Sequence, residues 1–133
     1  MEKKKVLIIE DELNIRDVYA EVLKEANFDV VEASDGHTVM EMARAGNWDL
    51  MLLDIMLPKR DGLEILSEVK KVEVLKSKPI ILLTNLGRDS IVKEGYSLGA
   101  SGYLIKSEIN PDDVVCAVRK LLDENEPSPQ NYI

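Results

Sequence analysis

The segment DLMLLDIMLP, residues 49–58, contains an acid at the point where a continuous apolar run ends. Residues 50–53 are four successive large apolar side chains, a run too short for a buried helix and typical of a strand covered on both faces. Asp54 follows this run directly. Because a carboxylate is costly to remove from water, an acid at the end of a buried strand indicates a functional role.

Other apolar runs along the chain end in polar residues in the same way: Glu10 and Asp11 after residues 6–9, Thr84 after residues 80–83, and Lys106 after residues 103–105. Each signal is weak alone, since acids at strand ends often cap turns and helices. The carboxyl ends of parallel strands meet at one edge of a sheet, however, and ligands bind there. The joint placement therefore predicts a site.

Strand and helix patterns alternate five times along the chain. The expected strands are Val6–Ile9, Asp29–Ala33, Leu50–Leu53, Pro79–Leu83 and Tyr103–Ile105. The expected helices carry an apolar stripe from Ile15 to Ala26, run from Asp35-Gly36 to about Ala45, begin at Asp61-Gly62, run from roughly Asp89 to Leu98, and follow Pro111 with Asp112-Asp113 in the first turn. This alternation predicts an α/β fold with a parallel sheet and helices on both faces.

The helix expected near Asp89 to Leu98 has the weakest pattern. Gly95 costs it about 1 kcal/mol relative to alanine, and its apolar stripe is thin. We therefore expect it to be the most mobile helix of the domain.

Length and composition restrict the class of protein. The 133 residues suit one domain, expected over residues 1–125, with a disordered tail at 126–133. A net charge of −8 argues against direct nucleic-acid binding, and no apolar stretch is long enough to span a membrane. The single cysteine, Cys116, excludes a disulfide framework. We expect a cytoplasmic protein.

Glu10, Asp11 and Asp54 would bring three carboxylates close together at the predicted edge. Such a group repels itself unless a cation intervenes, and oxygen ligands without histidine or cysteine favour Mg²⁺. A carboxylate beside Mg²⁺ suits phosphoryl transfer to aspartate, with Lys106 pairing with phosphoryl oxygens and the Thr84 hydroxyl donating to another.

Four sequence blocks resemble those of the receiver domain of bacterial two-component response regulators. They are VLIIEDE at 6–12, LLDIMLPKRDG at 52–62, ILLTN at 81–85 and GYLIK at 102–106. The resemblance covers about residues 4–122 and is nearest to the stand-alone, chemotaxis-regulator-like type. It implies a flavodoxin-like (βα)5 three-layer sandwich with sheet order 2-1-3-4-5.

The resemblance also implies residue roles. Asp54 would accept a phosphoryl group from the phosphohistidine of a sensor kinase or phosphotransfer protein. Asp11, Asp54 and the main-chain carbonyl of Met56 would bind Mg²⁺, with Glu10 acting directly or through water. Thr84 and Tyr103 match the switch pair that alters the face of the fourth helix, fifth strand and fifth helix. The downstream target would be a protein, and the chain a monomer or a weak phosphorylation-dependent dimer.

Two features bear on how this chain differs from its relatives. Ser107 follows Lys106 where the family usually has proline, so we expect a trans peptide bond there. Met56 and Leu86 occupy positions that influence how water reaches the acyl phosphate in this family. Because both are apolar, neither can orient an attacking water, and we hypothesise slow self-dephosphorylation.

Three alternatives stay open from the sequence. A phosphohydrolase of the haloacid dehalogenase type would want a second acid two residues after Asp54, where Met56 stands. A binding-only pseudo-receiver would typically lose one of the site residues, all of which are kept here. The chain could also be a receiver from a longer protein, with EPSPQNYI as the start of a linker.

Overall fold

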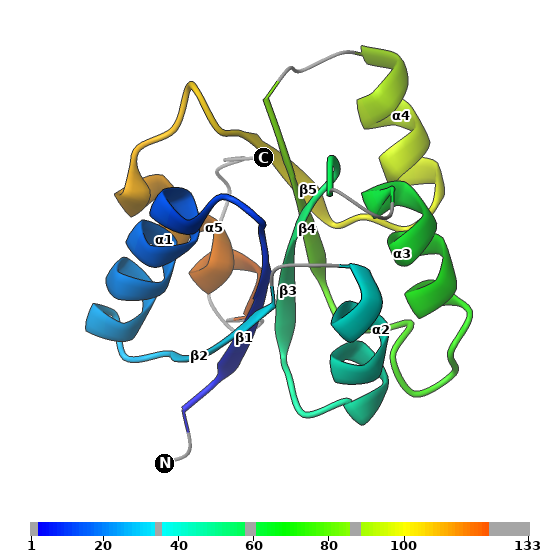
Figure 1. Cartoon of the computed structure of the whole chain (residues 1–133), viewed down its shortest axis with the longest axis horizontal. Helices are drawn as coiled ribbons and strands as arrows, with labels where there is room; N and C mark the ends of the chain where they lie inside the picture. Colours follow the sequence, from blue (N-terminus) through cyan, green and yellow to red (C-terminus); the bar gives the residue numbers. More distant parts are fainter. Residues whose placement is uncertain (1–2, 34–35, 58–60, 86–88, 123–133) are drawn as a thin grey trace.

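Five parallel strands form one sheet between two layers of helices (Figure 1). The computed structural model describes residues 3–33, 36–57, 61–85 and 89–122. The strands are β1 (Lys5–Ile9), β2 (Asp29–Ala33), β3 (Leu50–Asp54), β4 (Ile80–Thr84) and β5 (Gly102–Ile105). The helices are α1 (Leu13–Glu25), α2 (Gly36–Ala45), α3 (Gly62–Lys70), α4 (Asp89–Ser97) and α5 (Pro111–Leu122). The predicted elements are thus all present within the described residues.

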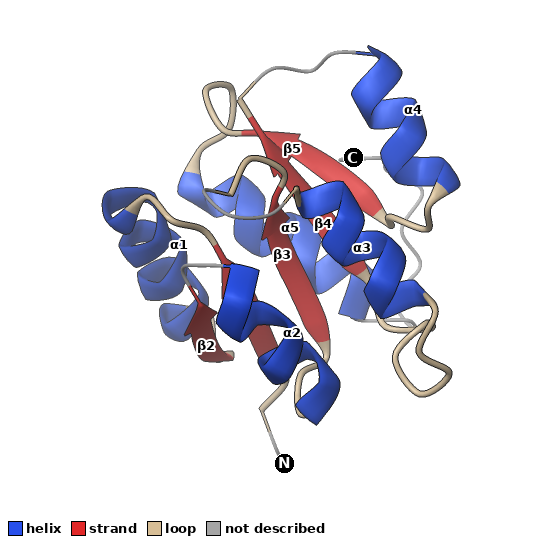
Figure 2. Ribbon diagram, turned by 45° about the vertical axis from the view of Figure 1, so that its right-hand side comes forward, coloured by secondary structure: helices blue, strands red, loops and turns tan. Residues whose placement is uncertain are grey.

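The sheet order is β2-β1-β3-β4-β5, as predicted. Helices α1 and α5 cover one face of the sheet, and α2, α3 and α4 cover the other (Figures 1 and 2). This is the three-layer arrangement expected of the flavodoxin-like fold. The order in which strands are added reverses between β1 and β3, and the carboxyl ends of these two strands are therefore where ligands bind in folds of this class.

Alternation along the strands divides the core into two clusters. In β1, Val6 and Ile8 pack with α1 and α5, whereas Leu7 and Ile9 pack with α2 and α3. Strand β3 alternates in the same way, and all five of its residues are buried. Because both faces of these strands are covered, their sequences read as continuous apolar runs.

Local chemistry accounts for the starts of two helices, α3 and α5. Asp61 caps α3, its carboxylate accepting a hydrogen bond from the Leu63 amide at 2.8 Å. At the start of α5, the Asp113 carboxylate accepts from the Asn110 amide at 2.9 Å, and two acids occupy the first turn. The predicted placement of Pro111 and the paired aspartates is confirmed.

Gly95 has a packing role that its sequence context did not reveal. It is buried, and a Cβ at this position would meet the Leu82 side chain of β4. The residue therefore allows α4 to approach the sheet closely, which offsets part of its cost in helix propensity. Helix α4 ends at Ser97, one residue before the expected end.

None of the helices in the described parts of the chain is both long and apolar enough to cross a lipid bilayer. The tail predicted at 126–133 lies outside the described residues.

Candidate functional site

Three carboxylates converge at the carboxyl ends of β1 and β3. Oxygen atoms of Glu10, Asp11 and Asp54 all lie within 4.8 Å of one another. Glu10 and Asp54 are buried, at 0% and 3% exposure, while Asp11 is exposed. Parallel pairing of β1 with β3, Ile9 opposite Leu53, brings the two strand ends to the same level. The structure thus brings together the three acids selected from the sequence.

Lys106 reaches this cluster from the end of β5. Its ammonium nitrogen lies 2.7 Å from Oε1 of Glu10 and 3.0 Å from Oδ2 of Asp54, and its side chain is 4% exposed. Oε1 of Glu12, an exposed acid, lies 3.7 Å from the same nitrogen. A single buried cation therefore faces two buried carboxylates, and the described cluster keeps an excess of negative charge.

The two oxygens of the Glu10 carboxylate have different partners. Its Oε2 accepts a hydrogen bond from the Glu12 amide at 3.1 Å. Its Oε1 contacts Lys106 as an ion pair, but has no well-aligned hydrogen-bond donor among the described residues. A buried carboxylate oxygen without such a donor can accept a further positive partner.

Burial raises the pKa of the Glu10 carboxyl to about 7; Lys106 opposes this rise, and the neighbouring Asp54 carboxylate adds to it. For Lys106, burial by itself disfavours the ammonium form. Pairing with Glu10 and Asp54 outweighs burial, so the pKa of Lys106 lies above its usual value. Lys106 consequently stays charged at neutral pH, whereas Glu10 titrates near neutrality.

Backbone atoms of Met56 and Gly62 lie close to the end of β3. The Met56 amide donates to Oδ1 of Asp54 at 3.0 Å, and the Gly62 amide donates to the Ile55 carbonyl at 2.7 Å. A Cβ on Gly62 would lie 2.6 Å from the Ile55 Cα and closer still to the Asp54 carbonyl. Position 62 therefore requires glycine for close backbone approach. From the sequence, Asp61-Gly62 was interpreted only as a helix start. The close approach of Gly62 to the backbone of Asp54 was not predicted.

Thr84 and Tyr103 lie on neighbouring strands. Thr84 is buried at the end of β4, one residue beyond Leu83, which pairs with Asp54 across the ladder. Tyr103 of β5 is partly buried, packs on the core cluster beside α2 and α3, and meets Tyr96 of α4 edge-on, with ring centroids 6.1 Å apart. By strand alternation, Thr84 occupies a position that faces the side of the sheet covered by α2 and α3. Lys106 occupies a position that faces the other side, covered by α1 and α5.

Arg16 also touches the site, and the sequence reading missed it. Its Nη1 donates to the Glu10 carbonyl at 2.9 Å, and its Nε donates to Oε1 of Glu32 at 3.2 Å. One signal pointed to it. An arginine in the first turn of a helix opposes the helix dipole, and α1 has no acid there. Such a placement needs a compensating partner.

Two further expectations have different outcomes. No cis peptide bond occurs in the described ranges, so the bond between Lys106 and Ser107 is trans, as expected. Leu86 lies outside the described residues. Met56, the other position expected to tune dephosphorylation, is 72% exposed beside Asp54.

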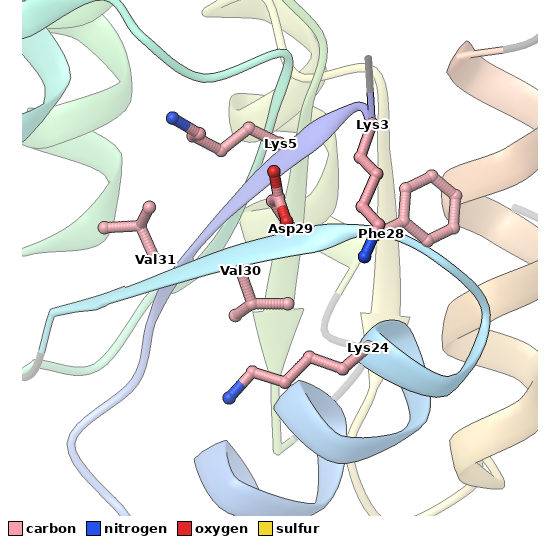
Figure 3. A pocket seen from close by; sticks show the side chains of 7 residues that line it. All are labelled: Lys3, Lys5, Lys24, Phe28, Asp29, Val30 and Val31. Carbon is pink, nitrogen blue, oxygen red and sulfur yellow. The ribbon is translucent and has the colours of Figure 1, made fainter. Parts of the chain in front are cut away.

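A hollow at the opposite end of the sheet has a different character (Figure 3). It is lined by Lys3, Lys5, Lys24, Phe28, Asp29, Val30 and Val31, where β1 and β2 begin. The amino groups of Lys5 and Lys24 lie on opposite sides of the β2 ribbon (Figure 3). These lysines do not converge on one point, in contrast to the acids at the other end.

The acidic cluster fits a hard divalent cation. Its donors are carboxylate oxygens without histidine or cysteine, which is the set that Mg²⁺ prefers. Asp11 is exposed, so its carboxylate is accessible to an ion, while the buried Glu10 and Asp54 carboxylates lie next to it beside Lys106. The backbone amide of Met56 contacts Asp54, and its carbonyl stays a predicted ligand.

The family model for the response regulator receiver domain matches residues 6–119. The chain belongs to the response regulator receiver family. Family membership therefore favours a receiver over the phosphohydrolase of the haloacid dehalogenase type, which the sequence had left open. Receivers are phosphoacceptors of two-component signalling rather than typical enzymes, they bind Mg²⁺ at an acidic pocket, and they interact with histidine kinases or phosphotransfer proteins.

Three known proteins that are similar to this receiver show how close the resemblance is. The transcriptional regulatory protein SrrA of Staphylococcus aureus is 33% identical over 96% of the chain, which spans 55% of that protein's length. The chemotaxis response regulator CheY4 of Vibrio cholerae is 28% identical, with a TM-score of 0.85 over 91% of this chain and 100% of its own. The Mn²⁺-bound response regulator Rcp1 is 29% identical, with a TM-score of 0.78 over 96% of this chain and 99% of its own.

The receiver spans about half the length of the curated relatives that it matches. The expected stand-alone, chemotaxis-like type is therefore not confirmed, because relatives of this receiver include both a chemotaxis regulator and a transcriptional regulator.

Proposed function

We propose that Asp54 is the phosphorylated residue of this receiver and that phosphorylation depends on Mg²⁺. The observation that carries the proposal is the contact of one buried carboxylate, Asp54, with both the Lys106 ammonium at 3.0 Å and two further acids within 4.8 Å. Asp54 is buried, ends β3, and accepts a hydrogen bond from Lys106 through Oδ2.

The transfer is a displacement at phosphorus. A carboxylate oxygen of Asp54 attacks the phosphorus of a phosphohistidine, and the phosphorus–nitrogen bond breaks with its electron pair going to the imidazole. The product is an acyl phosphate on Asp54. Lys106 pairs with a phosphoryl oxygen and so releases its hold on Asp54, and the Thr84 hydroxyl donates to another.

Glu10, Asp11, Asp54 and the Met56 carbonyl are the residues that would hold Mg²⁺. Bound there, the ion supplies positive charge that offsets the phosphoryl oxygens and the acids. Glu10 contributes directly or through water, and its binding requires loss of the proton that its raised pKa retains. The Mn²⁺-bound form of the similar response regulator Rcp1 supports binding of a divalent metal.

The proposed output is a change in the face made by α4, β5 and α5. Thr84 and Tyr103 would respond to phosphorylation, the hydroxyl moving toward the phosphoryl group and the ring turning inward. Tyr96 supports this proposal, because it joins Tyr103 to α4 through an edge-on ring contact. A shift of the Tyr103 ring would therefore be felt by that helix.

The proposed phosphodonor is a sensor histidine kinase or phosphotransfer protein, and the proposed location of the receiver is the cytoplasm. The proposed target of the switching face is a protein, with no direct contact to nucleic acid or membrane. It is a separate protein if the receiver is of the stand-alone type, and an attached domain if the receiver belongs to a longer regulator. A monomer, or a weak dimer after phosphorylation, is proposed for the receiver itself.

The test is intact mass after incubation with Mg²⁺ and phosphoramidate, a small phosphodonor that needs no kinase. We expect one phosphoryl adduct on the wild-type chain. The adduct should be absent from Asp54→Ala and from wild type with EDTA, and present in Asp17→Ala, which removes an exposed acid of α1.

Two results would overturn the proposal. An adduct on Asp54→Ala would mean that another residue accepts the group. No adduct on wild type with phosphoramidate or acetyl phosphate would favour the binding-only pseudo-receiver, with a partner that does not depend on phosphate.

A further inference from the structure

Arg16 links three elements at the carboxyl edge of the sheet. The residue lies in the first turn of α1, and its backbone amide donates to the Glu12 carbonyl at 3.0 Å. Its Nη1 donates to the carbonyl of Glu10, the first residue after β1. Its Nε pairs with Glu32, the penultimate residue of β2. Its side chain is 16% exposed and that of Glu32 is 32% exposed, so the ion pair lies at the surface, whereas the contact with the Glu10 carbonyl is partly buried.

The loop that Arg16 holds carries the exposed acid of the cluster. Asp11 follows the carbonyl that Arg16 binds, and α1 begins two residues later, after Glu12. The preceding peptide is also held, because the Glu10 amide donates to the Ala33 carbonyl at 3.1 Å. The Glu10 backbone is thus fixed on both sides, to β2 and to α1, and the direction in which Asp11 points depends on it.

The charge of Arg16 is balanced locally. A lone guanidinium near three carboxylates would weaken their attraction for a cation, but Glu32 pairs with Arg16 at 3.2 Å. The pair is neutral as a unit, so its effect on the cluster is geometric. The planar guanidinium suits this task because its donors leave in fixed directions, and a lysine ammonium cannot reproduce them.

We propose that Arg16, held by Glu32, is a positioning residue that sets the metal-binding geometry of Glu10 and Asp11. It touches neither metal nor phosphoryl group and acts through the Glu10 carbonyl. The inference rests on the proposed function, because it assumes that the acidic cluster binds a divalent cation.

The test is the affinity for Mn²⁺, measured on the unphosphorylated full chain by electron paramagnetic resonance, with Mg²⁺ as competitor. Arg16→Lys keeps the positive charge but removes the planar set of guanidinium donors. We expect the affinity for Mn²⁺ to fall about ten-fold, as for other residues that orient metal ligands. Glu32→Gln keeps an acceptor for Nε, and we expect a smaller loss than for Arg16→Lys.

The matched control is Arg119→Lys. Arg119 also donates to a backbone carbonyl, that of Ala26 at 3.5 Å, but lies on α5 with no contact to the acids. Its replacement by lysine should leave the affinity for Mn²⁺ unchanged. Thermal unfolding of every variant separates a loss of geometry from a loss of fold.

A second readout separates positioning from general damage. The rate of phosphorylation by phosphoramidate should fall in Arg16→Lys at low Mg²⁺ and recover at saturating Mg²⁺, because the defect lies in metal binding. A rate that stays low at saturating Mg²⁺ would overturn the positioning role.

The outcomes distinguish the two proposals. Wild-type chain that takes up neither Mn²⁺ nor phosphate would overturn the proposed function and this inference together. Wild-type binding with equal affinity in Arg16→Lys would overturn the inference alone. Loss of affinity in Arg16→Lys with a normal unfolding temperature would establish it.

Discussion

Asp54 ends β3 and Lys106 directly follows β5, two strands that are separated in the sheet by β4, yet Nζ of Lys106 lies 3.0 Å from Oδ2 of Asp54. The lysine side chain therefore crosses the end of β4 to reach the acid. It also contacts Glu10 at 2.7 Å, so one ammonium joins the carboxyl ends of β1, β3 and β5.

Replacing Lys106 tests this arrangement. Lys106→Met leaves two buried carboxylates without their cation, and we expect the free energy of unfolding to fall by about 3 kcal/mol at pH 8. The loss should be smaller at pH 5.5, where Glu10 carries a proton. Urea unfolding measures both values. Lys76→Met, which breaks an exposed pair with Glu73, should cost less than about 1 kcal/mol. Equal losses in the two variants would contradict the buried-pair account.

The raised pKa of Glu10 predicts pH-dependent metal binding. A proton on Glu10 competes with the metal, so apparent Mg²⁺ affinity should rise as pH increases from 6 to 8, through the pKa of about 7. Calorimetric titration of wild type and Glu10→Gln checks this. The variant should bind more weakly and show a flatter pH dependence. A variant with the full wild-type pH dependence would assign the proton to another group.

The same pKa affects the stability of the metal-free chain. Folding raises the pKa of Glu10 from 4.5, so the folded state binds more protons than the unfolded state between the two values. The Glu10 contribution to the free energy of unfolding must therefore fall as pH rises from about 4.5 to about 7. Urea unfolding across this range should show that fall in wild type, and Glu10→Gln should lack that part of it.

Substitution by alanine should change the free energy of unfolding by different amounts at Gly62 and at Gly95. Gly62→Ala drives a Cβ against the backbone of Asp54 and Ile55, which cannot yield without moving the site, and should cost about 3 kcal/mol. Gly95→Ala meets the movable end of Leu82 and gains helix propensity, so its net effect should stay within about 1 kcal/mol. Denaturant unfolding of both variants gives the comparison, and the reverse order would refute it.

Phosphate lifetime should depend on Met56. Its side chain is 72% exposed next to Asp54 and has no group that can orient water. Met56→Asn supplies an amide for that purpose, and we expect the lifetime of the acyl phosphate to shorten several-fold. Loss of the phosphoryl adduct with time, followed by mass, measures it. Val74→Asn, at another exposed apolar position, serves as the control. An unchanged or longer lifetime in Met56→Asn would contradict the hypothesis.

Most of the fold was predictable because its signals are local. Buried parallel strands read as short apolar runs, as in residues 50–53, and alternation with amphipathic helices specifies the layers. Element ends were less certain. Strand β4 begins at Ile80 and includes Thr84, one residue later than expected at each end, because pairing with β5 extends to Ile105.

The membership of the acidic cluster was predictable for a related reason. Parallel strands end at one edge, so polar residues that follow apolar runs must gather there whatever the details of packing. The chain order of residues thus specified the architecture and brought the acids and the amine to one edge, whereas the role of the Thr84 hydroxyl stays a prediction.

Tertiary structure alone decided how these groups interact. The contacts of Arg16 with Glu32, of Lys106 with Glu10, and of the Gly62 backbone with Ile55 depend on strand register and on side-chain direction. The raised pKa of Glu10 likewise depends on burial and on distances to Lys106 and Asp54. Local sequence patterns carry no information on such distances, because they arise only when strands distant in the chain are packed side by side.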